Sequence, residues 1–198
     1  MHRNKVIKAA NALKKGFLVV YPTDTLYGIG ADVYNNEAVR DVFRVKKRSF
    51  SKPLSVAVAD KKSIKKLAYV DETAEKLIDF FLPGCLTLVL KKKEGLPDLV
   101  TGGQSKVGIR IPENSFTLKL LEKISPITCT SANIHGMQTP SKIEDIKKML
   151  SSKKIKFYID EGSLSGDAST VVDISFNKVT ILREGKIPKR DVLDVIQG

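Results

Sequence analysis

Apolar residues recur at two spacings along the chain, and these spacings predict its helices and strands. Val6, Ile7, Ala10 and Leu13 follow helical spacing, and the continuous apolar run 17–21 comes directly after them. Runs with helical spacing and runs typical of strands continue to alternate as far as the C-terminal segment. The predicted helices cover 4–15, 36–46, 114–123, 141–150 and 188–196, with two shorter ones after Asp60 and Asp71; the predicted strands cover 17–21, 54–59, 86–90, 107–111, 127–130, 156–160, 169–175 and 178–183.

Polar residues at the edges of the helical runs indicate where the helices begin. Asn36, Asp60 and Asp71 each stand one position before such a run and can accept a hydrogen bond from the first turn. Ser141 and Glu144 have the spacing of a capping box. The sequence therefore predicts four capped helices in the body of the chain.

The last two strand-like runs, 169–175 and 178–183, meet at Phe176 and Asn177 and predict a hairpin. A hairpin brings an antiparallel pair into an alternation of helices and strands that otherwise favours parallel pairing. The pattern therefore predicts an α/β fold with a mixed sheet. Gly28 and Gly30 lack the third glycine of a dinucleotide-binding fingerprint, and no phosphate-loop motif occurs, so neither of these sites is expected.

Length and composition fit one globular domain spanning 1–198, because 42% of its residues are hydrophobic. The excess of 34 Lys and Arg over 22 Asp and Glu gives a net charge of +12, which favours anionic partners such as nucleotides or RNA but also fits a basic, solvated surface. No apolar run reaches the roughly 20 residues of a membrane span, and the N-terminus lacks a signal-peptide core. We therefore expect a cytoplasmic protein. Cys85 and Cys129 form no Cys-x-x-Cys pair and are expected to be buried.

Candidate chemistry gathers in the turn 22–30, the basic loop 46–54 and the polar turn 130–136. With His2 and His135 as the only histidines and no nucleophile pattern near them, a hydrolase triad has little support. Hydroxyls and cations suit phosphoryl or nucleotidyl transfer, and they equally suit RNA binding. Each segment taken singly is also typical of a cap, a turn or a solvated helix end. The hydroxyl candidates are Thr23, Thr25, Ser131, Thr139 and Ser169, and the cations are Lys46, Arg48, Lys52, Arg110 and Arg183.

Several motifs follow one another in a fixed order over about residues 4–187. They are Pro22-Thr23-Asp24-Thr25-Leu26-Tyr27-Gly28-Ile29-Gly30, Lys46-Lys47-Arg48 with Lys52-Pro53-Leu54, Pro83-Gly84 with Leu86-Thr87-Leu88, Val107-Gly108-Ile109-Arg110-Ile111-Pro112, Ser131-Ala132-Asn133 with Gly136, Ser169-Thr170-Val171-Val172-Asp173, and Ile181-Leu182-Arg183-Glu184-Gly185. In this order they closely resemble the YrdC-like (TsaC) family of threonylcarbamoyl-AMP synthases.

The resemblance implies a YrdC-like fold, in which flanking helices and a twisted, mixed but mainly parallel sheet surround a positively charged cavity. It implies the short form, without an additional C-terminal domain. It also implies a nucleotidyltransferase that converts L-threonine, bicarbonate or CO₂, and ATP to L-threonylcarbamoyladenylate and pyrophosphate, the first step of threonylcarbamoyladenosine modification of tRNA. Mg²⁺ would enter with ATP rather than at a protein-held metal site, and a downstream threonylcarbamoyl-transferase would be a partner.

The alternative is an RNA- or tRNA-binding module, or a paralogue without synthase activity; a basic synthase could also bind tRNA weakly. The resemblance further implies roles for individual residues. The catalytic set is Lys46, Arg48, Ser131 and Asn133. The ATP-binding set is Arg48, Lys52, Lys106, Ser131, Thr139 and Arg183. The threonine-binding set is Thr25, Arg110, Cys129 and Ser169, with Arg110 expected to hold the amino-acid carboxylate through a two-pronged pair. The chain departs from the family pattern at Ala57, Cys85 and Lys106.

Overall fold

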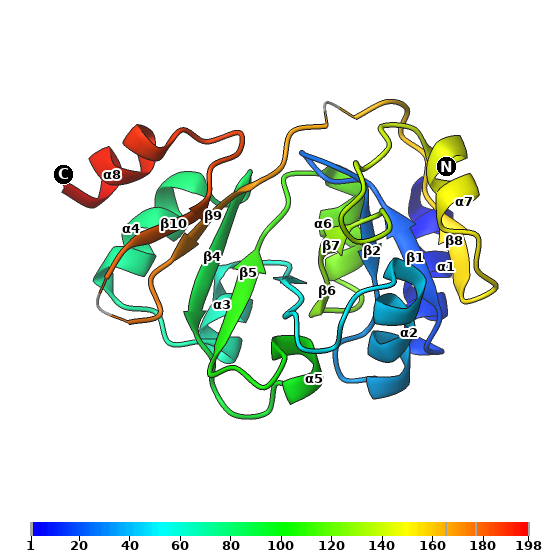
Figure 1. Ribbon diagram of the computed structural model, residues 1–198, viewed down its shortest axis with the longest axis horizontal. Helices are drawn as coiled ribbons and strands as arrows, with labels where there is room; N and C mark the ends of the chain where they lie inside the picture. The colour runs from blue at the N-terminus through cyan, green and yellow to red at the C-terminus, as the bar shows by residue number, and fades with distance from the viewer. Residues whose placement is uncertain (1, 165, 177, 198) are drawn as a thin grey trace.

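The computed structural model describes residues 2–164, 166–176 and 178–197, which form eight helices and ten strands (Figure 1). The helices are α1 (His2–Lys14), α2 (Asn36–Lys46), α3 (Lys61–Leu67), α4 (Glu72–Phe81), α5 (Asp98–Thr101), α6 (Ser115–Leu121), α7 (Ile143–Met149) and α8 (Lys189–Gln197). The strands are β1 (Leu18–Tyr21), β2 (Gly28–Gly30), β3 (Val56–Ala57), β4 (Leu86–Lys91), β5 (Lys106–Arg110), β6 (Ile127–Thr128), β7 (Thr130–Ser131), β8 (Ile155–Tyr158), β9 (Thr170–Asp173) and β10 (Thr180–Arg183).

The strands form two mixed sheets, with the orders β7-β2-β1-β8 and β10-β9-β4-β5-β3-β6. The predicted mixed α/β fold with flanking helices is therefore confirmed. The expectation of mainly parallel pairing is wrong, because five of the eight strand pairs among the described residues are antiparallel. The short connection 22–27 between β1 and β2 is one reason, since a parallel return needs a long crossover.

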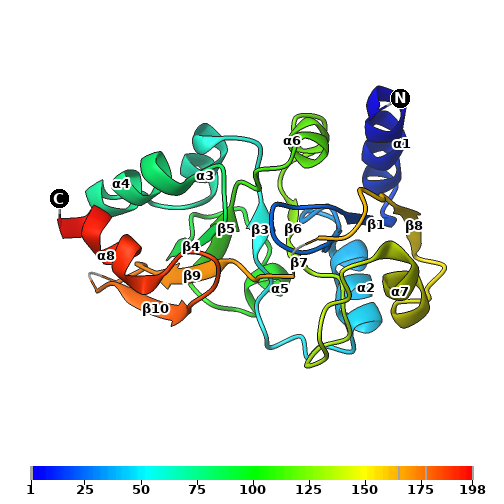
Figure 2. The ribbon, with the colours of Figure 1, turned by 90° about the horizontal axis from the view of Figure 1, so that it is seen from above.

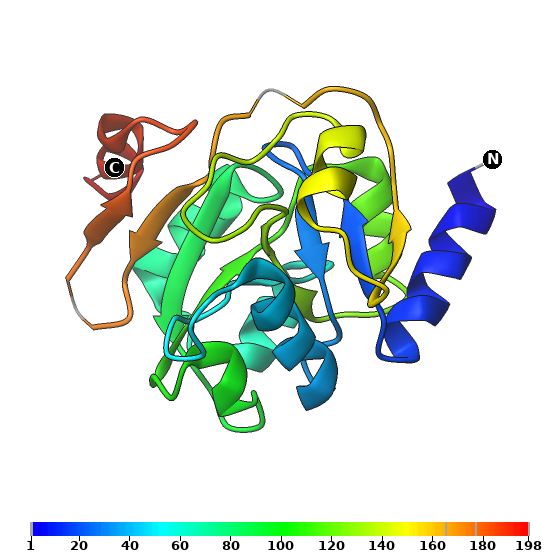
Figure 3. The same ribbon diagram turned by 45° about the vertical axis from the view of Figure 1, so that its right-hand side comes forward.

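Helices cover both faces of the strands, as Figure 2 shows: α3, α4 and α6 lie along one side, and α2, α5 and α7 along the other. Helices α2 and α5 lie next to each other (Figure 3), while α1 and α8 lie at opposite ends of the longest axis (Figure 1). Two clusters of buried side chains form the core. The larger contains Ile29, Val56 and Leu88, and the smaller joins α1 to α6 through Leu13 and Phe116. No helix in the described ranges has the length and apolarity needed to cross a membrane.

Strand β2 lies in the segment 22–30, which was predicted to be a turn. The strand could not be recognised from the sequence, because its two glycines carry no side chain and so give no alternation of apolar and polar residues. The ring of Tyr21 on β1 packs across these glycines, and a Cβ on Gly30 would come within 2.8 Å of Tyr21 Cε1. The Tyr21 hydroxyl then donates to the Thr128 carbonyl at 3.1 Å, so the glycines let a neighbouring strand's aromatic side chain bridge to β6.

Several predicted boundaries shift in the structure. Asp60 and Asp71 cap α3 and α4 as predicted, whereas the N-cap of α2 is Asn35 instead of Asn36. The predicted capping box is wrong: Lys142 precedes α7 and no side chain caps it. The predicted strand 54–59 shortens to β3, the strand 127–130 divides at Cys129, and α5 was not predicted. The predicted hairpin is present as the antiparallel pair β9–β10; its expected turn residue Asn177 lies outside the described residues.

Candidate active site

The two sheets meet at Cys129, the single residue between β6 and β7, which belong to different sheets. Its backbone N–H donates to the Ser55 carbonyl at 2.7 Å. A cavity of about 220 Å³ opens beside this residue and takes its walls from both sheets. Seven residues of the predicted sets line it: Thr25, Arg48, Arg110, Cys129, Ser131, Ser169 and Arg183.

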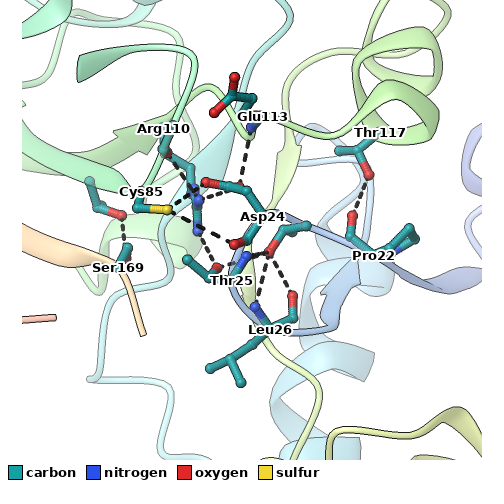
Figure 4. A network of polar contacts seen from close by, with 12 residues as sticks. Pro22, Asp24, Thr25, Leu26, Cys85, Arg110, Glu113, Thr117 and Ser169 are labelled. Carbon is teal, nitrogen blue, oxygen red and sulfur yellow. Dashed lines mark hydrogen bonds and ion pairs between the residues drawn. The ribbon is translucent and has the colours of Figure 1, made fainter. Parts of the chain in front are cut away.

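Arg110 lies at the end of β5 and reaches the turn after β1, where it forms a buried ion pair (Figure 4). Its Nη2 donates to Asp24 Oδ1 at 2.7 Å and to the Gly84 carbonyl at 3.1 Å, and its Nη1 donates to Thr25 Oγ1 at 3.0 Å. The side chains of Arg110 and Asp24 are only 6% and 8% exposed. Nε is buried without a partner in the described structure. Because Nε is buried and Nη2 is already bonded, a two-pronged pair with a ligand carboxylate would require the guanidinium to move or Asp24 or Gly84 to yield Nη2.

Asp24 is a site residue that is absent from the predicted sets. Besides Arg110, it accepts hydrogen bonds from the Glu113 amide at 3.2 Å and the Cys85 thiol at 3.0 Å (Figure 4). Burial, followed by the hydrogen bond to Asp24 and its charge, raises the pKa of Cys85 to about 12, so the thiol remains a donor. Asp24 therefore fixes the position of Arg110 from behind the cavity. Its place between two threonines in the motif was the available signal.

The turn that carries Asp24 and Thr25 is held by Thr23. The Thr23 hydroxyl oxygen accepts from the amides of Thr25 and Leu26 at 3.1 and 3.2 Å and lies 2.9 Å from Thr25 Oγ1. Such side-chain bonds to nearby amides are typical of Thr-containing turns. They aim the Thr25 hydroxyl at the cavity.

Ser169 and Arg183 contact each other in the lining of the cavity. Nε and Nη2 of Arg183 donate to the Ser169 carbonyl at 3.0 and 2.8 Å, and Nη2 also donates to Ser169 Oγ at 3.0 Å. Ser169 Oγ lies 2.9 Å from Thr87 Oγ1. Burial, and then the charge of Arg110, lowers the pKa of Arg183. A predicted threonine-binding hydroxyl and a predicted ATP-binding arginine are therefore in direct contact.

Lys46 ends α2 beneath the Ser-x-Asn turn and does not reach the cavity wall. Its residue is 1% exposed, and its ammonium donates to the Asn133 carbonyl at 2.8 Å, to Asn133 Oδ1 at 3.1 Å and to the Ser131 carbonyl. Asn133 Oδ1 also accepts from Ser131 Oγ at 2.6 Å. Burial, and secondarily the charge of Arg48, lowers the pKa of Lys46 to about 7, while the three accepting oxygens favour its protonated form. Lys46 and Asn133 thus hold Ser131 from behind.

Arg48 lines the cavity, and Lys52 lies beside it. Arg48 Nη2 donates to the Pro53 carbonyl at 2.8 Å. The imidazole of His135 lies between the two cations, with Nδ1 3.3 Å from Arg48 Nη1 and Nε2 2.8 Å from Lys52 Nζ. Thr139 is half-buried on the same loop as His135 and is not among the lining residues. No role was predicted for His135, and its contacts could not be read from the sequence.

Of the two remaining predicted site residues, Lys106 lies away from the cavity and Cys129 lines it. Lys106 begins β5, at the opposite end from Arg110, and its ammonium contacts Asp173 Oδ2 at 2.7 Å. It is not among the residues that line the cavity. Cys129 does line the cavity, and burial raises the pKa of its thiol, which disfavours a thiolate nucleophile. Three arginines line the cavity and Asp24 pairs with one of them; the positive charge predicted for the cavity stays a prediction.

Comparison with known proteins gives one consistent family. The sequence model of the Sua5/YciO/YrdC family, which carries the description telomere recombination, matches residues 11–185. A Methanocaldococcus jannaschii protein provisionally named threonylcarbamoyl-AMP synthase is 44% identical over 188 residues, which cover 94% of this chain and 88% of that protein. The Pyrococcus abyssi threonylcarbamoyl-AMP synthase is 37% identical over 195 residues, which cover 97% of this chain and 57% of that protein.

Solved structures give the same relationship. The crystal structure of P. abyssi Sua5 complexed with L-threonine matches with a TM-score of 0.92 at 37% identity, covering 97% of this chain and 57% of that one. The E. coli YciO crystal structure matches with a TM-score of 0.87 at 27% identity, covering 95% of this chain and 92% of that one. The chain therefore spans little more than half of the P. abyssi protein and most of the E. coli protein.

Proposed function

The chain belongs to the Sua5/YciO/YrdC family, and from that premise we propose that it is a threonylcarbamoyl-AMP synthase. The reaction would convert L-threonine, bicarbonate or CO₂, and ATP to L-threonylcarbamoyladenylate and pyrophosphate, which makes the enzyme a nucleotidyltransferase in tRNA modification. One observation carries the proposal beyond family membership. Residues from distant segments, among them Thr25, Arg48, Arg110, Ser131 and Ser169, converge on one polar cavity.

The chemistry requires little acid–base assistance at the attack step. Once the threonine amine has lost a proton and captured CO₂, the resulting carbamate is an anion. A carbamate oxygen forms a bond to the α-phosphorus of ATP, and the bond from that phosphorus to the pyrophosphate oxygen breaks. Catalysis then consists mainly of alignment and of stabilising negative charge. A cavity lined with arginines and hydroxyls suits that demand.

On this proposal, the wall formed by Thr25, Arg110 and Ser169 binds threonine. Arg110 supplies the cation for the threonine carboxylate from the cavity wall, and Asp24 keeps the guanidinium in position. The Thr25 and Ser169 hydroxyls offer hydrogen bonds for the polar groups of the amino acid. Cys129 would contribute the backbone and thiol surface beside them. The volume of about 220 Å³ lies below the roughly 300–1,000 Å³ of common small-molecule sites, which suits an amino acid-sized ligand in the enclosed part.

ATP would extend from the cavity towards the basic loop, with Arg48, Ser131 and Arg183 on the cavity wall and Lys52 and Thr139 beyond it. Lys46 and Asn133 would act by positioning Ser131. We expect Mg²⁺ to arrive bound to ATP, where phosphate oxygens and water supply its ligands and the metal neutralises phosphate charge. The described residues include no cluster of three or more His, Cys, Asp or Glu side chains that could hold a metal. The ATP contact of Lys106 stays a prediction; its ammonium pairs with Asp173, and the residue does not line the cavity.

The direct test incubates the purified protein with ATP, bicarbonate, Mg²⁺ and labelled threonine. Threonine-dependent release of pyrophosphate with formation of threonylcarbamoyl-AMP is the expected result, and absence of both would overturn the proposal. Arg48→Ala and Ser131→Ala should lose activity while remaining folded. Arg40→Ala, an exposed position on the same α2 helix as Lys46, is the matched control and should retain activity.

The same preparation separates the synthase from a nucleic-acid-binding module. Salt-dependent affinity for tRNA without any turnover would favour the module. If turnover is present, the Arg48→Ala variant shows whether tRNA uses the cavity. Loss of turnover with unchanged tRNA affinity would indicate a separate surface.

A further inference from the structure

The imidazole of His135 lies between two cations, one of which, Arg48, lines the cavity. Its Nδ1 is 3.3 Å from Arg48 Nη1 and its Nε2 is 2.8 Å from Lys52 Nζ. The backbone fixes this arrangement, because the His135 amide donates to the Lys46 carbonyl at 2.7 Å and thereby ties the loop after β7 to the end of α2. The ring is exposed and therefore open to a ligand that approaches the cations.

The hydrogen-bonding capacity of this group is unbalanced. A guanidinium and an ammonium only donate, whereas a neutral imidazole has one accepting nitrogen and an imidazolium has none. His135 can therefore satisfy only one of its two charged neighbours. Within the described ranges, none of the ion pairs involves Lys46, Arg48 or Lys52. Arg48, Lys52 and His135 therefore offer more donors than acceptors to one another, and no carboxylate of the described residues forms an ion pair with either cation.

The electrostatic surroundings of the ring agree with this imbalance. The pKa of the His135 imidazole is lowered. Desolvation is the largest cause, and the charges of Lys52, Arg48 and Lys46 are the next largest. These neighbours therefore favour the neutral form of the ring while no anion is bound. An anion placed between the cations would reverse the effect of their charges and favour protonation.

We propose that His135 is a further phosphate-binding residue of this site, which takes up a proton when the β- and γ-phosphates of the nucleotide, or the pyrophosphate product, bind between Arg48 and Lys52. The identity of the ligand rests on the proposed function. The imidazolium then adds a third cation and a second N–H donor to the phosphates. It stabilises the charge that accumulates on the pyrophosphate as the bond to the α-phosphorus breaks.

The protonation can be observed directly, because the chain has only two histidines. Imidazole resonances are titrated by NMR in the free protein and in saturating inorganic pyrophosphate, and the His135→Ala spectrum assigns the signals. We expect the pKa of His135 to lie below its ordinary value in the free protein and to rise when pyrophosphate binds, while the His2 signal moves little. A His135 signal that titrates identically with and without bound pyrophosphate would overturn the inference.

Affinity supplies the second measurement. Pyrophosphate binding by calorimetry should weaken roughly tenfold in His135→Ala at pH 6, as expected for loss of one charge-assisted contact, and the difference should shrink at pH 8.5. His135→Arg, which carries a permanent cation, should restore affinity and remove this pH dependence. Met137→Ala, exposed on the same loop, is the matched control and should bind as the wild type does. Equal affinity of His135→Ala and wild type at both pH values would also overturn the inference.

These results are separable from a failure of the proposed function, because pyrophosphate binding requires neither threonine nor bicarbonate. A protein without synthase activity whose His135 pKa rises with pyrophosphate would refute the synthase and retain the phosphate-binding role. An active synthase whose His135 is indifferent to pyrophosphate would retain the function and refute that role.

Discussion

Replacement of Lys46 by methionine tests whether this buried lysine positions the active site rather than stabilising the fold. Two large terms oppose each other at this position. Lowering the lysine pKa from 10.5 to about 7 corresponds to roughly 5 kcal/mol of unfavourable burial, at 1.36 kcal/mol per pKa unit. Against this, each of the three bonds from the ammonium to Ser131 and Asn133 contributes about 1.5–3 kcal/mol. The terms nearly cancel, so we expect Lys46→Met to lower the free energy of unfolding by only about 2 kcal/mol.

Activity should respond far more strongly than stability. Without the ammonium, the Asn133 carbonyl loses its donor and the turn that carries Ser131 is free to shift. A displacement of about 1 Å in an aligning residue can cost on the order of 100-fold in rate. Urea unfolding at pH 7 gives the stability change, and the threonylcarbamoyl-AMP assay gives the rate. Lys47→Met, the exposed neighbour, is the matched control and should change neither quantity substantially.

The pH dependence of the stability difference between the wild type and Lys46→Met tests whether the pKa of Lys46 is lowered in the folded protein. The unfolded chain binds a proton at Lys46 up to about its ordinary pKa, whereas the folded chain releases it at a lower pH. Between about pH 7 and pH 10 the unfolded state therefore holds more protons, and the stability of the wild type rises with pH relative to Lys46→Met, by at most about 1.4 kcal/mol per pH unit. A constant stability difference between pH 7 and 9 would refute the lowered pKa. Retention of full activity by Lys46→Met would refute its positioning role.

Three further predictions concern the ion pair, the glycine strand and the metal. Asp24→Asn should lower the free energy of unfolding by about 3 kcal/mol and raise KM for threonine, because it leaves the buried Arg110 charge without its anion. Urea unfolding measures the first effect and initial rates measure the second. An unchanged KM would argue against Arg110 as a threonine ligand. Gly30→Ala should cost about 1–3 kcal/mol, since the new Cβ would lie 2.8 Å from the Tyr21 ring, and an unchanged urea midpoint would contradict this packing. Removal of Mg²⁺ with EDTA should abolish turnover without changing the thermal unfolding midpoint of the nucleotide-free protein; a lowered midpoint would instead reveal a metal held by the protein itself.

Features that depend on neighbours in sequence could be predicted. Asp60 and Asp71 each accept from an amide three residues later, at 2.7 and 2.8 Å, and this local geometry is encoded in the order of residues. Strand β2 could not be predicted in the same way. Gly28 and Gly30 carry no apolar side chain, and their pairing is supported by Tyr21 from the preceding strand. The signal for β2 therefore lies in a tertiary contact and not in periodicity.

The candidate site also has features that could be predicted from local sequence and features that depend on the fold. Its motifs supplied the hydroxyls and cations, but only the fold determines which of them face the cavity. Lys106 and Arg110 stand four residues apart on one strand, yet Lys106 pairs with Asp173 at one end while Arg110 enters the cavity at the other. Asp24 was overlooked because its function depends on Arg110, which is distant in sequence.

The contact between Arg183 and Ser169 explains why the two predicted ligand sets cannot be treated as separate sites. Arg183 is bound to both the carbonyl and the hydroxyl oxygen of Ser169, so a phosphate that draws the guanidinium away leaves the Ser169 hydroxyl free for another partner. Arg110 stands close enough for its charge to lower the pKa of Arg183, so an anion at either arginine relieves the repulsion that the other experiences. Binding of either substrate is therefore expected to change the hydrogen bonds and charges of the groups that bind the other. Threonine and ATP are expected to bind with coupled affinities, and by thermodynamic linkage that coupling must be reciprocal.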